Sequence, residues 1–211
     1  MFGMLLGGLS AVLGVVAKLV PTVIKIVGTE LVTFAKALEA FFTALGILKP
    51  GENVEEIGDR ALQAEEDELE PITVENSGSY EKYQERLAEY DRLDPEKSAL
   101  ITQEQKLHKG LEVLMGVSIE KFGEPLAALY PIILRDPTLY STTGRLEGLA
   151  KVAQEDKRQL EDIVGYISGS SRDSAKNDSA FDALSNIEKK VNPDATEQEI
   201  RNTIESLLDK K

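Results

Sequence analysis

Few side chains in this sequence are of types suited to metal binding or nucleophilic catalysis. The chain of 211 residues contains a single histidine, His108, and no cysteine. One imidazole without any thiol excludes the usual zinc-ligand sets and the Cys–His and Ser–His pairs of covalent catalysis. His108 also lies beside Leu107 and Leu111, which share one face of an expected helix. We therefore interpret it as a residue at the border of a helical core.

The 37 acidic residues are the remaining candidates for chemistry. Two carboxylates in different environments act as general acid and base in many enzymes, but no spacing in this sequence marks such a pair. The stretch 52–75 lacks the pattern of a calcium-binding loop, and residues 169–177 lack that of a phosphate-binding loop. We predict no catalytic, cofactor-binding or metal-binding residues and no cofactor, and we expect a protein that is not an enzyme.

The overall charge limits the partners that this chain can have. Its net charge is −13, whereas binding to phosphate backbones needs clustered lysine and arginine, so nucleic acid is not an expected partner. The absence of cysteine rules out a disulfide framework. The N-terminus has no basic region before its apolar run and no clear cleavage site, so we expect it to be retained rather than removed as a secretory signal.

The chain is organised around residues 1–48, which we expect to form one long and very apolar helix. No charged side chain precedes Lys18. Small or polar residues recur about every 3.6 positions from Gly3 onward and form a narrow stripe between apolar faces. A water-soluble helix has the opposite proportions. The spacing of Gly3, Gly7 and Ala11 also favours close approach of helix backbones in a bilayer.

Such a helix needs apolar surroundings, which are lipid, copies of itself, or the core of an ordinary domain. As a membrane span it is borderline. Only residues 1–17 are free of charge, whereas about 20 consecutive apolar residues are needed to cross a bilayer. Pro21 is expected to kink the helix near Ala17, and Gly28 is a second weak point. The expected contacts with membrane or neighbouring subunits are Gly3, Leu5, Gly7, Leu9, Ala11, Val12, Gly14, Val16 and Lys18.

Residues 49–78 have a very different composition. Pro50 and Gly51 end the first helix, and the stretch 52–75 then carries ten acids against the single base Arg60. We predict an acidic linker that contains one short amphipathic helix, and the simplest interpretation is a solvated spacer. The alternative is a segment that is repelled by anionic lipid or that meets a basic partner.

Residues 79–168 have the pattern of a soluble helical bundle. Tyr80, Tyr83, Leu87 and Tyr90 share one helix face, which predicts core packing, with an exposed contact surface as the alternative. Two helix starts are indicated, by Asp94 before Pro95 and by a capping box from Thr102 to Gln105, and Gly116 is expected to end the second helix. A new start is expected at Asp136. Thr143 is expected to cap one helix that reaches about Ser168.

The last part of the chain is predicted to be a linker over residues 169–177 and a helical hairpin over residues 178–211. Asn192 and Pro193 separate the two helices of the hairpin, and Thr196 with Glu199 forms a second capping box. The hairpin is short enough to be a docking element for a protein partner, or it packs on the bundle.

The sequence as a whole predicts an all-α protein with a long hydrophobic N-terminal helix, an acidic linker, a helical bundle and a C-terminal hairpin. We expect a homo-oligomer that associates with a lipid bilayer through its N-terminal helix, as a pore or an anchor. The alternative is a structural subunit of a multi-subunit particle, such as a phage-type virion or injection apparatus. The expected location is accordingly a membrane or a large assembly.

Overall fold

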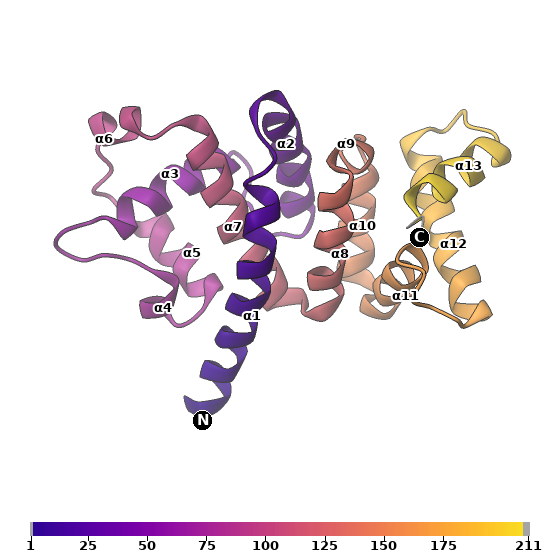
Figure 1. The fold of residues 1–211 in the computed structure, drawn as a ribbon, viewed down its shortest axis with the longest axis horizontal. Helices are drawn as coiled ribbons and strands as arrows, with labels where there is room; N and C mark the ends of the chain where they lie inside the picture. Colours follow the sequence, from indigo (N-terminus) through magenta and orange to yellow (C-terminus); the bar gives the residue numbers. More distant parts are fainter. Residues whose placement is uncertain (1, 209–211) are drawn as a thin grey trace. The chain divides into compact units, whose positions relative to one another are not determined.

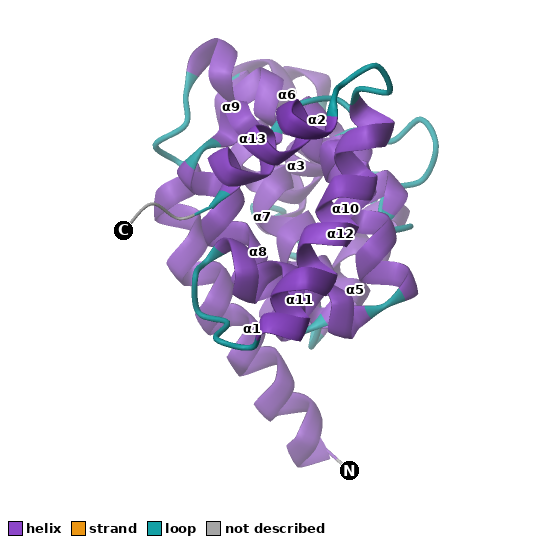
Figure 2. Cartoon of the chain, turned by 90° about the vertical axis from the view of Figure 1, so that its right-hand side faces the viewer, coloured by secondary structure: helices purple, strands orange, loops and turns teal. Residues whose placement is uncertain are grey.

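The computed structural model describes the backbone of residues 2–208 and the side chains of residues 8–208. Over these residues the chain forms thirteen α-helices and no strand, so the predicted all-α class is confirmed (Figure 2). No helix within this described part is both long enough and apolar enough to cross a membrane. The chain divides into two compact units, residues 1–123 and residues 124–211, which are described separately below.

Unit 1 is built around its last helix, α7, on which α1, α2, α3 and α5 pack (Figure 1). Every residue from Val113 to Ile119 is buried, so the middle of α7 has no solvent-facing side. The helices of unit 1 are α1 (Phe2–Val23), α2 (Gly28–Ala44), α3 (Val54–Glu65), α4 (Val74–Ser77), α5 (Tyr80–Glu89), α6 (Pro95–Leu100) and α7 (Gln103–Phe122).

The long N-terminal helix expected from the sequence is divided in two. The chain leaves helical geometry at residues 24–27, after Pro21, and α2 begins at Gly28, whose φ of +61° favours glycine. Two residues of α7 hold this turn: Glu104 Oε1 accepts a hydrogen bond from Gly28 N at 2.8 Å, and His108 Nε2 lies 3.0 Å from Ile26 O. Thus α2 receives its N-terminal cap from another helix.

The second half of the apolar stretch belongs to the core of unit 1. Phe34, Leu38, Phe41 and Phe42 on α2 are each at most 1% exposed. Their burial explains the high apolar content of residues 28–44 without any external partner.

The predicted acidic linker contains a core helix rather than a free spacer at residues 54–65. α3 and α7 cross with their backbones in close approach, because each helix has a glycine at the crossing. A Cβ atom on Gly58 would clash with Lys106 O, and one on Gly110 would clash with Val54 O. Of the acids of α3, Glu56 is exposed and the others are half-buried, while Val54, Ile57, Ala61 and Ala64 are buried.

The tyrosine face expected on residues 80–90 lies in the core of unit 1. Tyr80 and Tyr83 are at most 2% exposed, and the ring of Tyr80 packs on Gly116 of α7. Gly116 was expected to end a helix, but it lies inside α7, where the absence of a side chain makes room for that ring. The residues after Gly116 continue α7 as far as Phe122.

Unit 2 contains α8 (Glu124–Arg135), α9 (Pro137–Tyr140), α10 (Arg145–Glu155), α11 (Lys157–Ile167), α12 (Ser174–Val191) and α13 (Glu197–Leu207). The helix predicted from Thr143 to Ser168 is divided at Asp156, whose side chain caps α11 by accepting from Arg158 N and Gln159 N. α12 packs on α10, α11 and α13. It begins at Ser174, within the predicted linker 169–177.

Candidate functional site

One face of α1 packs against the protein's own core. Leu9, Val16, Leu19 and Val23 are at most 7% exposed and recur every three to seven positions, as expected for one side of a helix. α1 packs on α7 in unit 1. Two of the residues expected to contact a membrane or other subunits, Leu9 and Val16, are therefore buried within the chain itself.

The opposite face of α1 is open to solvent. Ala11, Gly14 and Lys18 are exposed, and no atom lies within 4 Å of the position that a Cβ on Gly14 would take. Val12 is half-buried. The structure thus assigns the expected contact residues to different sides of one helix. Gly3, Leu5 and Gly7 lie outside the residues whose side chains are described.

The exposed face coincides with the stripe of small and polar residues seen in the sequence. On α1, Ser10, Gly14, Lys18 and Pro21 are all exposed. Within α1 the predicted stripe follows the exposed side of the helix, whereas Lys25 and the later residues of the stripe lie beyond the end of α1. The sequence alone did not show that the apolar face opposite is covered by α7, because that contact joins residues about 90 positions apart.

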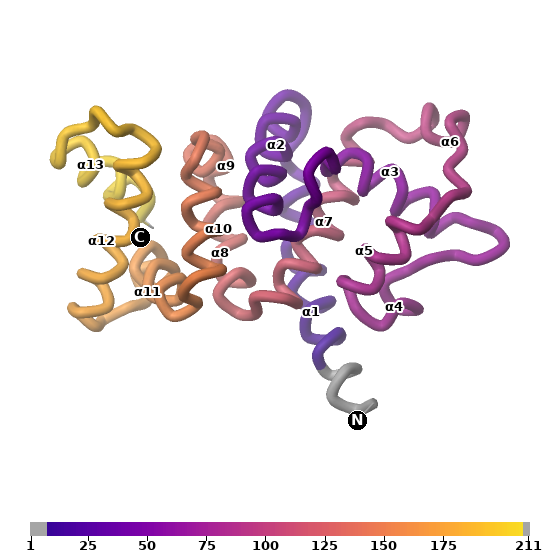
Figure 3. The backbone as a smooth tube through the Cα atoms, turned by 180° about the vertical axis from the view of Figure 1, so that it is seen from behind, coloured from indigo at the N-terminus to yellow at the C-terminus, as the bar shows by residue number. Residues whose placement is uncertain are grey.

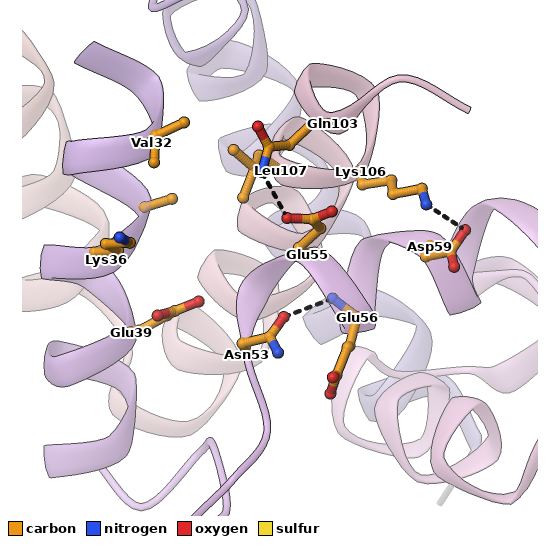
Figure 4. A pocket seen from close by; sticks show the side chains of 11 residues that line it. Val32, Lys36, Glu39, Asn53, Glu55, Glu56, Asp59, Gln103, Lys106 and Leu107 are labelled. Atoms are coloured by element: carbon orange, nitrogen blue, oxygen red, sulfur yellow. Dashed lines mark hydrogen bonds and ion pairs between the residues drawn. The ribbon is translucent and has the colours of Figure 1, made fainter. Parts of the chain in front are cut away.

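A pocket of about 450 Å³ lies between α2, α3 and α7 (Figure 4). Its polar side chains mostly bind one another: Gln103 Nε2 donates to Glu55 Oε2 at 2.8 Å, and Lys106 Nζ lies 3.5 Å from Asp59 Oδ1. Glu39 Oε1 accepts from Val54 N at 2.9 Å and so ties α2 to the start of α3. These contacts join helices, and no arrangement here pairs a nucleophile with a base.

A second polar cluster joins α3, α5 and α7. Glu65 Oε1 accepts a 2.6 Å hydrogen bond from the Tyr83 hydroxyl and lies 2.8 Å from Lys109 Nζ, while Glu112 lies 3.2 Å from the same Lys109 nitrogen. Burial, reinforced by Glu65, raises the pKa of Tyr83 far above its usual value. Burial alone lowers the pKa of Lys109, but Glu112 and Glu65 outweigh that effect and raise it. A lysine held charged in this way is a structural cation rather than a nucleophile.

The side chains that can bind metal ions are dispersed over the described part of the chain. Across the described residues no three His, Cys, Asp or Glu side chains lie close enough together to hold a metal ion. His108 is half-buried, in agreement with the predicted position at the border of a helical core, and its Nε2 contacts Ile26 O in the α1–α2 turn, which was not predicted.

Comparison with known proteins gives no relative for this chain: no family model, no curated protein and no solved structure matches it.

Proposed function

We propose that this chain is a non-enzymatic, oligomeric protein that associates with lipid bilayers through the exposed face of α1, as an anchor- or pore-like component. One observation supports this proposal above the others. Although Leu9 and Val16 are buried, Leu13 and Val15 stay partly exposed, and Ala11 and Gly14 are open to solvent. Folding of the chain thus leaves an apolar, small-residue surface on its most apolar helix.

The charge at the end of this surface is compatible with an interfacial position. Lys18 is the first charged residue of the chain and is exposed on the same face as Gly14. A lysine at this place can extend its ammonium group to lipid headgroups while its methylene chain covers apolar surface. The location that follows is a membrane surface or a large assembly.

A second candidate function is a structural subunit of a multi-subunit particle, such as a phage-type virion or injection apparatus. The open space beside Gly8 and Gly14 favours it, because a neighbouring helix can approach closely where no Cβ intervenes. In this arrangement α1 of one copy packs on α1 of another, and lipid is not required.

The C-terminal hairpin of α12 and α13 is proposed as a contact for a protein partner. A surface pocket of about 400 Å³ opens between its helices, and the Arg201 guanidinium lies 5.0 Å from the centre of the Phe181 ring beside it. Stacked arginine and aromatic groups are common at protein interfaces.

The test uses the whole chain, because α1 and α2 are part of the folded core. We expect the wild-type protein to float with vesicles of phosphatidylcholine and phosphatidylglycerol, and the variant Ala11→Glu/Gly14→Glu to remain in the soluble fraction. Both positions are exposed, so the added carboxylates oppose burial in lipid without disturbing the core. The matched control is Ala88→Glu/Ala128→Glu, which adds two carboxylates at exposed helical positions elsewhere.

Light scattering after size exclusion, without lipid or detergent, separates the two candidates. A large oligomer that forms without lipid and is lost only in the α1 variant supports the particle subunit. A wild-type monomer that stays off vesicles contradicts both.

A further inference from the structure

Three leucines stand out from the surface of unit 1 on the segments that follow α3 and α5. Leu69 is 86% exposed, Leu93 is 41% exposed and Leu100 is 84% exposed. α6, which ends at Leu100, has no buried residue at all. We call residues 66–70 together with residues 91–100 the leucine strip. These segments run along one edge of unit 1 in Figures 1 and 3.

The strip is fixed to α3 and the turn after it by contacts spaced four residues apart. Asp59 Oδ2 accepts from the Ser98 hydroxyl at 2.7 Å, and Gln63 Oε1 accepts from Asp94 N at 2.8 Å. Four residues further on, Asp67 Oδ2 accepts from the Tyr90 hydroxyl at 2.9 Å. Residues 90–98 therefore lie antiparallel to α3, held by side chains from one of its faces.

Asp67 joins the two segments of the strip. Its Oδ1 accepts hydrogen bonds from Leu69 N at 2.9 Å and Glu70 N at 3.0 Å, while its Oδ2 lies 2.8 Å from Arg92 Nε. The backbone hydrogen bond from Glu70 contributes most to holding the pKa of Asp67 well below its usual range. The backbone beside Leu69 and Leu93 is thus ordered before any partner arrives, which lowers the entropic cost of binding there.

The leucines are surrounded by negative charge. Residues 66–70 and 91–100 contain seven acids and two bases, a net charge of −5 in fifteen residues. Glu66, Glu68, Asp91 and Glu96 are exposed, whereas Arg92 is engaged with Asp67. The surface therefore combines exposed leucines with exposed carboxylates that form no ion pair among the described residues. A complementary partner is both apolar and basic.

We propose that the leucine strip binds a basic amphipathic helix of another protein, with its leucines on the apolar face of that helix and its carboxylates beside lysine or arginine. Asp59 and Gln63 lie about one turn apart on α3, about 6 Å at the rise of an α-helix, and Asp67 continues the row in the turn after the helix, so the strip can accompany more than one turn of a bound helix. This surface is separate from the exposed face of α1, so the proposal does not depend on membrane association.

The probe for the test is a fluorescent peptide of lysine and leucine, with its leucines at positions i, i+3, i+4 and i+7 so that they share one helix face; it is titrated with the full chain in an anisotropy measurement. We expect Leu69→Ser/Leu100→Ser to weaken binding by about tenfold, because exposed apolar anchors dominate such interfaces. The matched control is Ile24→Ser/Val27→Ser, which removes the two other large exposed apolar side chains of the described chain and should leave the affinity within about twofold.

Charge variants and a second peptide complete the test. Glu66→Gln/Glu68→Gln should weaken binding more than Glu85→Gln/Glu89→Gln on α5, where both carboxylates are also exposed. A peptide with serine in place of every leucine should bind at least about tenfold more weakly than the lysine–leucine peptide. Equal affinity for both peptides, unchanged affinity in the leucine variant, or no binding to the wild-type chain would each overturn the proposal.

Discussion

Glycine residues serve opposite purposes at different places in unit 1. Gly58 and Gly110 let α3 and α7 approach until backbone meets backbone, whereas Gly14 faces open solvent on α1. All three lie inside helices, where the sequence alone gives each the same low helix propensity. The three-dimensional structure is needed to distinguish a glycine that allows close helix packing from a glycine that is exposed to solvent.

This difference predicts opposite effects for the same substitution. Gly110→Ala should lower the free energy of unfolding by about 1–3 kcal/mol or more, because its Cβ would clash with the carbonyl of Val54. Gly14→Ala should raise it by about 0.5–1 kcal/mol, because alanine is the better helix former and meets no neighbour there. Urea unfolding measures the free energy of unfolding of both variants. Equal changes in the two variants would contradict the described α3–α7 crossing.

Asp67 predicts a dependence of stability on pH. Because its pKa is lower in the folded chain than the ordinary value of 3.8, it stabilises the fold above that value, and the effect is lost as the pH falls through the folded pKa. Asp67→Asn should therefore be less stable than wild type at pH 7, and the difference should shrink below about pH 4. Thermal unfolding between pH 3 and pH 7 measures it. A difference independent of pH would show that the carboxylate charge is not the cause.

At the scale of elements, the sequence predicted helix starts better than helix lengths. Capping boxes at Thr102 and Thr196 and the N-cap at Asp94 are confirmed, because each depends on residues within one turn. The division of residues 1–48 at the α1–α2 turn was not predicted as a definite break, because Glu104 and His108 on a distant helix hold it. The stop predicted at Gly116 was wrong for a similar reason, since Tyr80 occupies the space beside it.

In unit 2, α10 and α12 are joined by a buried ion pair. Arg145 and Glu188 are each 4% exposed, and Arg145 Nη2 donates to Glu188 Oε2 at 2.8 Å. The guanidinium also donates to Leu139 O, so several of its hydrogens are satisfied. No pattern in the sequence indicates this pair, because its two residues lie 43 positions apart among many other charges.

Removal of one partner of this pair should be costly. Glu188→Ala leaves a buried guanidinium without its carboxylate, and we expect it to lower the free energy of unfolding by about 3–5 kcal/mol. The double variant Arg145→Met/Glu188→Leu should recover a large part of that loss, because it removes both charges and keeps apolar volume. Denaturant unfolding tests both, and a single variant as stable as wild type would show that the pair is not buried in solution.

At the scale of the whole molecule, the predicted bundle over residues 79–168 includes parts of both units. The division along the chain falls after Gly123, a single residue between α7 and α8, and this position carries none of the usual compositional signs of a linker. The acidic segment was predicted as a spacer because ten carboxylates lie close together in sequence. In the fold, Asp59, Glu65 and Asp67 bind side chains of later segments, and such long-range pairing leaves no local pattern.

The net charge also differs along the chain. Residues 1–50 contain four lysines and two glutamates, a net charge of +2, whereas the remaining residues carry 20 bases and 35 acids. The proposed membrane-facing or subunit-facing part of the molecule is therefore the part with least negative charge. This distribution favours contact through α1, because the acidic remainder is repelled by anionic lipid and by other copies of itself.

The most direct measurement of the central proposal places an environment-sensitive dye on the exposed face of α1. The chain has no cysteine, so Ala11→Cys gives a single labelling site, and Ala128→Cys gives a control at an exposed position in unit 2. We expect the emission of the dye at residue 11 to shift to the blue and to brighten when vesicles are added, while the dye at residue 128 stays unchanged. Emission at residue 11 that responds neither to vesicles nor to protein concentration would contradict both membrane association and assembly through α1.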